Sequence, residues 1–265
     1  MSDDVHFIDQ AVPGSTGTAR IAYRQTPRKT SSHSGKSPVC ASEVLFCGGF
    51  HSNMDGGKAE FLHQRMAGIG RSFTRFDYRG HGLSGGRFAD GTIGDWLSDA
   101  EMVLDRLCGA RVTLVGSSMG AWIAMNLAKR HPARIAGMVL IAPAPDFPRR
   151  LMLPELTVEQ RVALDRDGVW YRPSEFEDDP YPITKALIDE STAHEVLDGG
   201  FISVAGPVHI LHGDADEVVP MGHARQAAAL IKAQPLTFEC VEGGGHRLSE
   251  PHELERLWQA VTAIP

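Results

Sequence analysis

Residues 112–120 have the sequence VTLVGSSMG. The first four predict a buried β-strand, and the last five match G-x-S-x-G, a sharp turn from a strand into a helix with an exposed serine at its tip. Gly116 and Gly120 suit this turn because a side chain at either position would collide with the neighbouring backbone. Residues 121–129 are rich in helix formers and supply the helix. The order of strand, turn and helix predicts that Ser118 is a covalent nucleophile.

A nucleophilic serine needs a base that takes its proton and a third group that orients the base. Residues 208–211 (VHIL) predict a second buried strand, which leads into the acidic loop 212–220 (HGDADEVVP). A third strand at 236–241 is followed by GGGH at 243–246, a flexible loop that presents His246. The chain order of serine, aspartate and histidine is that of the α/β-hydrolases and differs from the orders in chymotrypsin-like and subtilisin-like proteases.

The acid loop carries a resemblance to a known family. Its pattern H-G-x-x-D-x-x-V-P, from His212 to Pro220, resembles the acid loop of α/β-hydrolase-fold esterases. The resemblance implies that Asp216 is the acid, while Asp214 makes hydrogen bonds within the turn, as short carboxylates do beside glycine. Asp146 is an alternative acid, because some members of the family take it from the end of the preceding strand. The other interpretation of Asp146 is a loop residue that leads into an insertion.

The base has to be chosen among twelve histidines. Only His246 combines a late position, a loop after a strand and a preceding run of glycines, so we expect it to be the base. His81 lies in RGHGLS (79–84), which resembles the family's loop after the fourth strand, where the histidine usually has a structural role near the mouth of the pocket. His51 and His212 are further candidates for side chains that neighbour the site.

Acyl transfer also needs two hydrogen-bond donors for the developing oxyanion, and removal of one such donor costs roughly a hundredfold to a thousandfold in rate. The backbone N–H of Met119, directly after the nucleophile, is one predicted donor. The other is the N–H of Phe50, because Gly48-Gly49-Phe50 follows the predicted strand 43–47 and resembles the H-G-F type of oxyanion loop. Gly48 stands where this loop often has a histidine.

A narrower resemblance is carried by residues 49–59 (GFHSNMDGGKA) and 75–82 (RFDYRGHG). These segments are similar to the branch of the α/β-hydrolases that contains mitochondrial palmitoyl-protein thioesterases, which also hydrolyse acyl glucuronides. The similarity covers about the first half of the fold, roughly residues 44–133. It implies a substrate that is a small-molecule or acyl ester or thioester.

Composition limits the other function classes. The chain has 265 residues, of which 42% are hydrophobic, and a formal net charge of −7. This charge provides no basic surface for nucleic acid, and no apolar run is long enough to insert into and span a bilayer. The four cysteines are dispersed, which favours free thiols in a reducing compartment and a cytoplasmic location; they are Cys40, Cys47, Cys108 and Cys240. No metal or organic cofactor is expected, because the nucleophile is a side chain of the protein.

The predicted elements alternate between strand and helix after an opening pair of strands. Strands are predicted at residues 5–10, 20–25, 43–47, 72–77, 112–115, 135–141, 208–211 and 236–241, and helices at 58–67, 93–107, 118–130, 222–233 and 250–263. Alternation of this kind predicts an α/β fold, specifically the α/β-hydrolase fold, with a mostly parallel central sheet and helices on both faces. Residues 1–265 form one predicted domain.

The alternation breaks at residues 144–205, which we call the cap segment. It mixes aromatic residues, acids and prolines, and we expect a small helical cap or lid. One interpretation is a packed surface excursion; the other is a lid that lines an acyl pocket, because insertions over a catalytic sheet edge commonly carry binding residues. The candidate substrate-binding residues are Leu151, Met152, Leu153, Trp170 and Tyr171.

Together these features predict a serine hydrolase that cleaves carboxylic esters or thioesters through an acyl-enzyme intermediate. Two enzyme alternatives use the same three residues on the same fold: a perhydrolase, and a lyase or carbon–carbon hydrolase. A non-catalytic small-ligand receptor is the alternative from another class, since a fold alone does not establish function. A receptor would be indicated by the loss of one of the three residues, and Ser118, Asp216 and His246 are all present.

Overall fold

The computed structural model describes residues 4–11, 18–26, 42–173 and 180–265 of the chain. Residues 27–41, which include Cys40 and most of the loop between the second and third strands, lie outside the described residues. Residues 174–179 of the cap segment also lie outside them.

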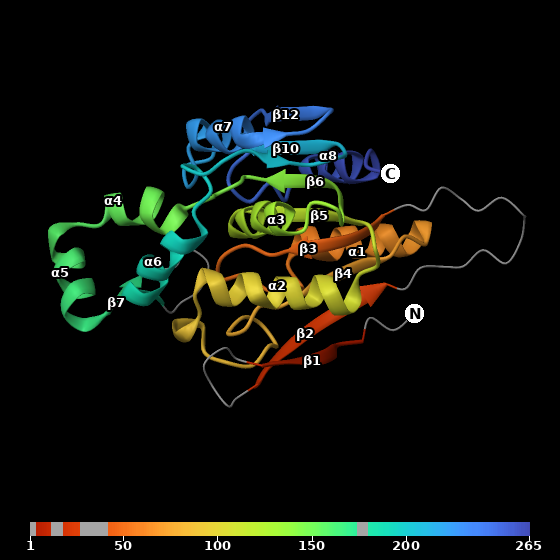
Figure 1. Cartoon of the computed structure of the whole chain (residues 1–265). Helices are drawn as coiled ribbons and strands as arrows, with labels where there is room; N and C mark the ends of the chain where they lie inside the picture. The colour runs from red at the N-terminus through yellow and green to blue at the C-terminus, as the bar shows by residue number, and fades with distance from the viewer. Residues whose placement is uncertain (1–3, 12–17, 27–41, 174–179) are drawn as a thin grey trace, which may run out of the picture.

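The centre of the molecule is an eight-stranded sheet (Figure 1). In order across the sheet its strands are β1 (His6–Ala11), β2 (Thr18–Thr26), β4 (Phe73–Phe76), β3 (Glu43–Cys47), β5 (Val112–Ser117), β6 (Ile135–Ile141), β10 (Val208–Gly213) and β12 (Leu236–Val241). β1 and β2 run antiparallel to their neighbours, and every pairing from β4 to β12 is parallel. The mostly parallel α/β fold predicted from the sequence is therefore confirmed.

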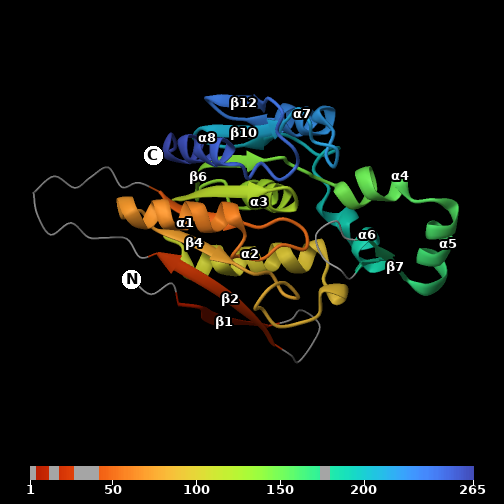
Figure 2. The same ribbon diagram turned by 180° about the vertical axis from the view of Figure 1, so that it is seen from behind.

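Helices cover both faces of the sheet, as the views from opposite sides show (Figures 1 and 2). On one face α1 (Gly57–Ile69) and α8 (Pro251–Thr262) pack against the sheet. On the other face lie α2 (Ile93–Leu107), α3 (Met119–Arg130) and α7 (Met221–Leu230). Because both faces are covered, β5 and β6 are buried along their whole length, which explains why their sequences are apolar runs rather than alternating patterns.

The start of α2 illustrates how local sequence sets an element boundary. Thr92 accepts a hydrogen bond from the Asp95 N–H at 3.3 Å, and the Asp95 carboxylate accepts one from the Thr92 N–H at 3.2 Å. This reciprocal capping box satisfies two backbone donors at a helix N-terminus. Asp95 also holds Arg79, whose guanidinium makes a second ion pair with the fully buried Asp99. The cap and the ion pairs fix α2 against the loop that follows β4.

The cap segment leaves the sheet after β6 and lies beyond one end of it (green to teal in Figure 1). It contains η2 (Pro148–Met152), α4 (Leu153–Glu155), α5 (Val158–Asp167), β7 (Val169–Arg172), β8 (Tyr181–Thr184), α6 (Lys185–Ser191) and η3 (Thr192–His194). The cap is thus helical as expected, with an additional antiparallel hairpin of β7 and β8.

The prediction of a helix to residue 233 is wrong at its C-terminal end, because α7 ends at Leu230. Residues Ile231–Lys232 form β11, which pairs in parallel with β9 (Ile202–Ser203) at the end of the cap segment. Ile231 and Ile202 are both almost completely buried. Pairing with a strand about thirty residues earlier in the chain overrides the local helical pattern of alanines.

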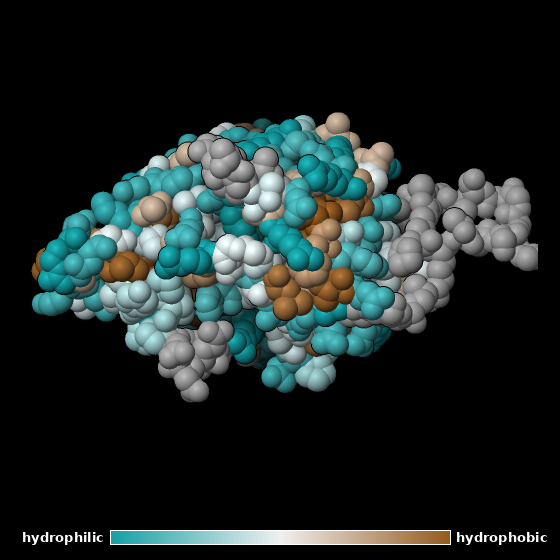
Figure 3. Space-filling view, turned by 90° about the horizontal axis from the view of Figure 1, so that it is seen from below, coloured by the Kyte–Doolittle hydropathy of each residue, from teal (hydrophilic) through white to brown (hydrophobic). Residues whose placement is uncertain are grey.

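The surface of the cap has exposed apolar side chains. Val158 and Val162 on α5 are 72% and 55% exposed, and Tyr171 on β7 is 58% exposed. The face of the molecule seen in Figure 3 is largely hydrophilic, with brown apolar atoms in separate patches. No helix within the described ranges has both the length and the apolar character that a membrane crossing requires.

Candidate functional site

Ser118 sits at the turn between β5 and α3 with φ 55° and ψ −114°. This backbone conformation is rare for a residue with a side chain and stores about 1–3 kcal/mol of strain. The two flanking glycines permit it: a Cβ on Gly116 would lie 2.4 Å from the carbonyl oxygen of Gly120, and a Cβ on Gly120 would lie 2.0 Å from that of Cys47. The turn predicted at 116–120 is therefore present, and Ser118 Oγ stands at its tip.

The Ser118 hydroxyl, His246 and Asp216 form one continuous chain of hydrogen bonds. Ser118 Oγ lies 3.0 Å from His246 Nε2, and His246 Nδ1 lies 2.9 Å from Asp216 Oδ2. A carboxylate only accepts, so Nδ1 carries the imidazole hydrogen and Nε2 is free to accept the hydroxyl proton. The residues come from three loops that follow β5, β10 and β12, at the same edge of the parallel sheet.

Asp216 is held in its ionised form by its surroundings. Its side chain is only 1% exposed, and Oδ1 accepts hydrogen bonds from the N–H groups of Val218 at 2.9 Å and Val219 at 2.8 Å. Burial by itself raises the pKa of a carboxyl group. The hydrogen bond from His246 and those from the two backbone N–H groups outweigh burial, and the pKa of Asp216 is lowered.

The two alternative acids have other partners. Asp214 accepts a hydrogen bond from the Gly243 N–H at 2.7 Å. Gly243 belongs to the loop after β12, so Asp214 joins the acid loop to the histidine loop rather than bonding within its own turn as expected. Asp146 is completely buried with φ 56°, and its two carboxylate oxygens accept the N–H groups of Val196 and Leu197 at 2.9 Å each. Asp146 therefore ties the returning end of the cap segment to the loop after β6.

The two predicted oxyanion donors lie on segments that run beside Ser118. Met119 is the first residue of α3, and the first N–H groups of a helix have no acceptor within the helix. The loop that carries Phe50 passes so close that a Cβ on Gly49 would lie 3.4 Å from the Ser117 carbonyl oxygen and 3.6 Å from Ser118 Cβ. Tyr78 OH donates to the Gly48 carbonyl oxygen at 3.5 Å and helps to fix this loop.

The other histidines named from the sequence differ in position. His212 is fully buried; its Nε2 donates to the Val219 carbonyl oxygen at 3.0 Å and lies 3.7 Å from Asp216 Oδ2. Burial lowers the pKa of His212 despite the nearby Asp216 carboxylate, so this imidazole supports the acid loop in its neutral form. His81 Nδ1 donates to the Arg79 carbonyl oxygen at 3.2 Å, and burial lowers its pKa to about 4. His81 is therefore also a neutral, buried ring.

Aromatic rings surround the side chain of Phe50, and we call them the Phe50 cluster. Phe50 makes edge-to-face contacts with Phe88, Trp96, Phe147 and Tyr181 at centroid distances of 5.0, 5.7, 5.3 and 5.9 Å. These rings come from η1 (Phe88–Asp90), from α2, from the start of the cap segment and from β8. The cluster joins the oxyanion loop to the cap.

Two residues without a role in the sequence interpretation contact the site's loops. Lys58 of α1 donates to the carbonyl oxygen of Arg247, the residue after His246, and lies 3.4 Å from Ser249 Oγ. Tyr181 of β8 contacts Phe50. Both come from segments remote in sequence from the residues they touch. Local sequence patterns carry no signal for such contacts, and only the fold reveals them.

The five predicted cap residues do not share one environment. Met152 is buried, and Leu151, Leu153 and Trp170 are partly buried against the core. Tyr171 is 58% exposed, contrary to the prediction that it lines a pocket. Successive side chains of a strand point to opposite faces, so Trp170 of β7 takes the inner side of the hairpin and Tyr171 the outer side.

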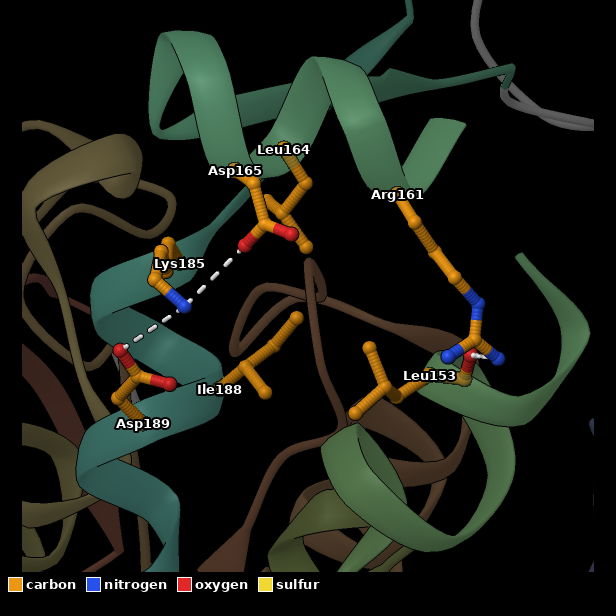
Figure 4. Close-up of a pocket in the computed structure, with 7 residues that line it drawn as sticks. All are labelled: Leu153, Arg161, Leu164, Asp165, Lys185, Ile188 and Asp189. Carbon is orange, nitrogen blue, oxygen red and sulfur yellow. Dashed lines mark hydrogen bonds and ion pairs between the residues drawn. The ribbon is translucent and has the colours of Figure 1, made fainter. Parts of the chain in front are cut away.

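Leu153 lines a cavity of about 230 Å³ between α4, α5 and α6 (Figure 4). Leu164 and Ile188 form the rest of its apolar wall, and Arg161, Asp165, Lys185 and Asp189 supply its charged groups. Lys185 Nζ lies between Asp165 and Asp189, at 3.4 and 3.5 Å. Within the described part of the chain, His, Cys, Asp and Glu side chains form no group of three or more that could hold a metal ion.

Comparison with known proteins gives matches over most of the chain. Residues 40–166 match the model of the serine aminopeptidase S33 family. Palmitoyl-protein thioesterase ABHD10, mitochondrial, from Mus musculus is 33% identical over 224 residues, which are 84% of this chain and 73% of the mouse protein. The protein of the same name from Rattus norvegicus is 31% identical over 223 residues, with 84% and 73% coverage.

Solved structures agree with these relatives. A putative hydrolase from Agrobacterium vitis S4 superposes with a TM-score of 0.89 at 36% identity and covers 98% of both chains. Mouse α/β-hydrolase domain-containing protein 10 superposes with a TM-score of 0.79 at 28% identity and covers 97% of both chains. The chain is an enzyme of the α/β-hydrolase family and belongs to the branch that includes the palmitoyl-protein thioesterase ABHD10.

Proposed function

We propose that the protein hydrolyses carboxylic esters or thioesters of a small or acyl substrate through an acyl-enzyme intermediate on Ser118. The observation that carries this proposal is the continuous hydrogen-bond chain from Ser118 Oγ through His246 to the buried Asp216 carboxylate. The thioesterase name of relatives at 31–33% identity supports an acyl substrate. Ester and thioester cleavage share the same first step.

In the acylation step Ser118 Oγ attacks the acyl carbon while its proton moves to His246 Nε2. Asp216 keeps the imidazole in the required tautomer and stabilises its positive charge once the proton has arrived. The negative charge on the acyl oxygen is stabilised by the N–H groups of Met119 and Phe50. When the tetrahedral adduct collapses, the bond to the alkoxide or thiolate breaks, and His246 gives its proton to this leaving group.

In the deacylation step water takes the place of the leaving group. His246 Nε2 removes a proton from this water, which attacks the acyl carbon of the ester on Ser118. A second tetrahedral adduct then collapses, the proton returns to Ser118 Oγ, and the carboxylic acid is released. Leu151, Met152, Leu153 and Trp170 are the proposed apolar surface for the acyl group, because they are the four cap candidates that lie in or pack against the hydrophobic core that also contains Met119.

The test is turnover by the purified wild type and by Ser118→Ala of p-nitrophenyl esters of increasing acyl length and of matched acyl thioesters. We expect both substrate classes to be cleaved by the wild type and a loss of at least 10³-fold in the variant. The dependence of the rate on acyl length measures the length of the acyl pocket, and the ratio of thioester to ester rates shows which substrate class the enzyme prefers. Wild-type enzyme that cleaves neither class would contradict the proposal.

The compartment is a separate question. The dispersed cysteines predict a cytoplasmic location, whereas the mammalian relatives are named as mitochondrial proteins. Fractionation of cells that produce the chain, followed by immunoblotting of each fraction, decides between the two.

A further inference from the structure

Besides Phe147 at its start, the cap segment contacts the oxyanion loop through Tyr181 of β8. The ring of Tyr181 stacks on His51 at a centroid distance of 5.0 Å with an interplanar angle of 20°. The same ring meets Phe50 edge-on at 5.9 Å and 66°. Phe50 and His51 are consecutive, so Tyr181 contacts two adjacent residues of the loop whose Phe50 N–H is the proposed oxyanion donor.

His51 has a backbone conformation that needs external support. Its φ is 55°, the left-handed region, where a residue with a Cβ is disfavoured. Strained conformations of this kind persist only where the surrounding structure holds them. The His51 ring is fixed between two aromatic neighbours: Phe88, edge-on at 4.6 Å, and Tyr181, stacked at 5.0 Å. Phe88 belongs to the body of the protein, whereas Tyr181 belongs to the cap.

We propose that Tyr181 is a positioning residue. Its contacts with His51 and Phe50 hold the oxyanion loop in its strained conformation. The position of the cap thereby determines the position of the Phe50 N–H. This inference rests on the proposed function. When the Tyr181 ring is removed, His51 loses the ring stacked on it and its φ relaxes toward negative values. The loop then changes direction directly after Phe50, and the N–H of Phe50 moves away from the oxyanion.

A purely substrate-binding Tyr181 would give a different result. If the ring served only as a wall for the acyl chain, its removal would raise KM for long esters and leave the turnover of a short ester unchanged. A positioning role acts on the transition state of every substrate, including p-nitrophenyl acetate, whose acetyl group is too short to fill an acyl pocket. The kcat for this short ester therefore separates the two roles.

The experiment compares kcat, KM and the pH profile of p-nitrophenyl acetate hydrolysis for the wild type, Tyr181→Ala, Tyr181→Phe and Phe201→Ala. For Tyr181→Ala we expect a fall in kcat of about 10- to 100-fold, less than complete loss of a donor, with KM within threefold and the shape of the pH profile unchanged. Tyr181→Phe keeps the ring and should retain at least half of the wild-type kcat. Phe201→Ala removes an aromatic ring that is 60% exposed in the same cap segment, and it should match the wild type.

A Tyr181→Ala variant with wild-type kcat on p-nitrophenyl acetate would overturn the inference while the proposed function stands. Wild-type enzyme with no Ser118-dependent esterase activity would overturn both.

His51→Gly provides a second variant that keeps the fold, because glycine adopts φ 55° without strain. In the His51→Gly protein, Tyr181→Ala should lower the logarithm of kcat by at most half as much as it does in the wild type. An equal cost in both backgrounds would show that His51 does not mediate the effect.

Discussion

At the scale of single residues, the identity of the acid is decided by which carboxylate faces His246. Asp216 Oδ2 lies 2.9 Å from His246 Nδ1, whereas Asp214 and Asp146 bind backbone N–H groups. The sequence placed all three carboxylates near the right edge of the sheet and ranked Asp216 first by resemblance alone. It could not separate them by physical argument, because the direction of each side chain depends on turns that close only in the folded chain.

Asp216→Asn is expected to reduce kcat by about 10³- to 10⁴-fold, since an amide cannot hold the imidazole in the tautomer that accepts the serine proton. Asp214→Asn should stay within threefold of the wild type, because an amide oxygen still accepts the Gly243 N–H. Steady-state hydrolysis of one p-nitrophenyl ester by both variants measures the difference. Equal losses in the two variants would contradict the assignment, and a loss of 10³-fold in Asp146→Asn would point to the rival acid.

At the scale of elements, the body of the fold was more predictable than the cap. The ranges of β3, α2, β6 and β12 agree with the prediction residue for residue, because each has a strong apolar pattern and clear turn or cap residues at its ends. The β7–β8 hairpin was not predicted. Its strands are only four residues long, and they are stabilised by burial of Ile183 in the core rather than by a local pattern.

The contact between the nucleophile turn and the oxyanion loop gives a prediction at this scale. In Gly120→Ala the new Cβ would meet the carbonyl oxygens of Cys47 and Gly48 at 2.0 and 2.4 Å, so α3 and the oxyanion loop must move apart. We expect a melting temperature lowered by at least 5 °C, on the order of 2 kcal/mol for a chain of this size, and a loss of esterase activity. Thermal unfolding by circular dichroism and ester hydrolysis measure the two effects.

Gly222→Ala is the matched control for this substitution. Gly222 lies in α7, and a Cβ there would have no atom within 4 Å. Alanine in a helix is favoured over glycine by about 0.5–1 kcal/mol, so this variant should be as stable as the wild type or slightly more stable. A Gly120→Ala variant with wild-type melting temperature and activity would mean that the two loops are not packed as described.

At the scale of the whole molecule, buried neutral histidines make stability depend on pH. Burial lowers the pKa of His81 from 6.5 to about 4, and burial also lowers the pKa of His212 and of His223. In the unfolded chain these rings bind a proton near pH 6.5, whereas in the folded chain they do not. The stability that these neutral rings contribute is therefore fully present above pH 6.5 and falls as the pH drops below 6.5; for His81 the loss continues to about pH 4.

The urea midpoint should consequently be lower at pH 5 than at pH 7.5. Protonation of His81 in the unfolded chain alone lowers the free energy of unfolding at pH 5 by up to about 2 kcal/mol, because pH 5 lies about 1.5 units below the pKa of an unfolded histidine. His81→Gln removes the titrating group and should reduce the difference between the two midpoints, whatever its effect on stability at pH 7.5. A pH difference in His81→Gln as large as in the wild type would show that His81 is protonated in the folded state.

Intact-mass analysis of the protein after treatment with a fluorophosphonate tests whether Ser118 is the nucleophile. The Ser118–His246 hydrogen bond of 3.0 Å and the buried Asp216 predict a single adduct on the wild type, mapped by peptide sequencing to Ser118. Ser118→Ala should remain unlabelled, and Asp216→Asn should label at least a hundredfold more slowly. A wild type without an adduct, or an adduct that persists in Ser118→Ala, would show that Ser118 is not the nucleophile.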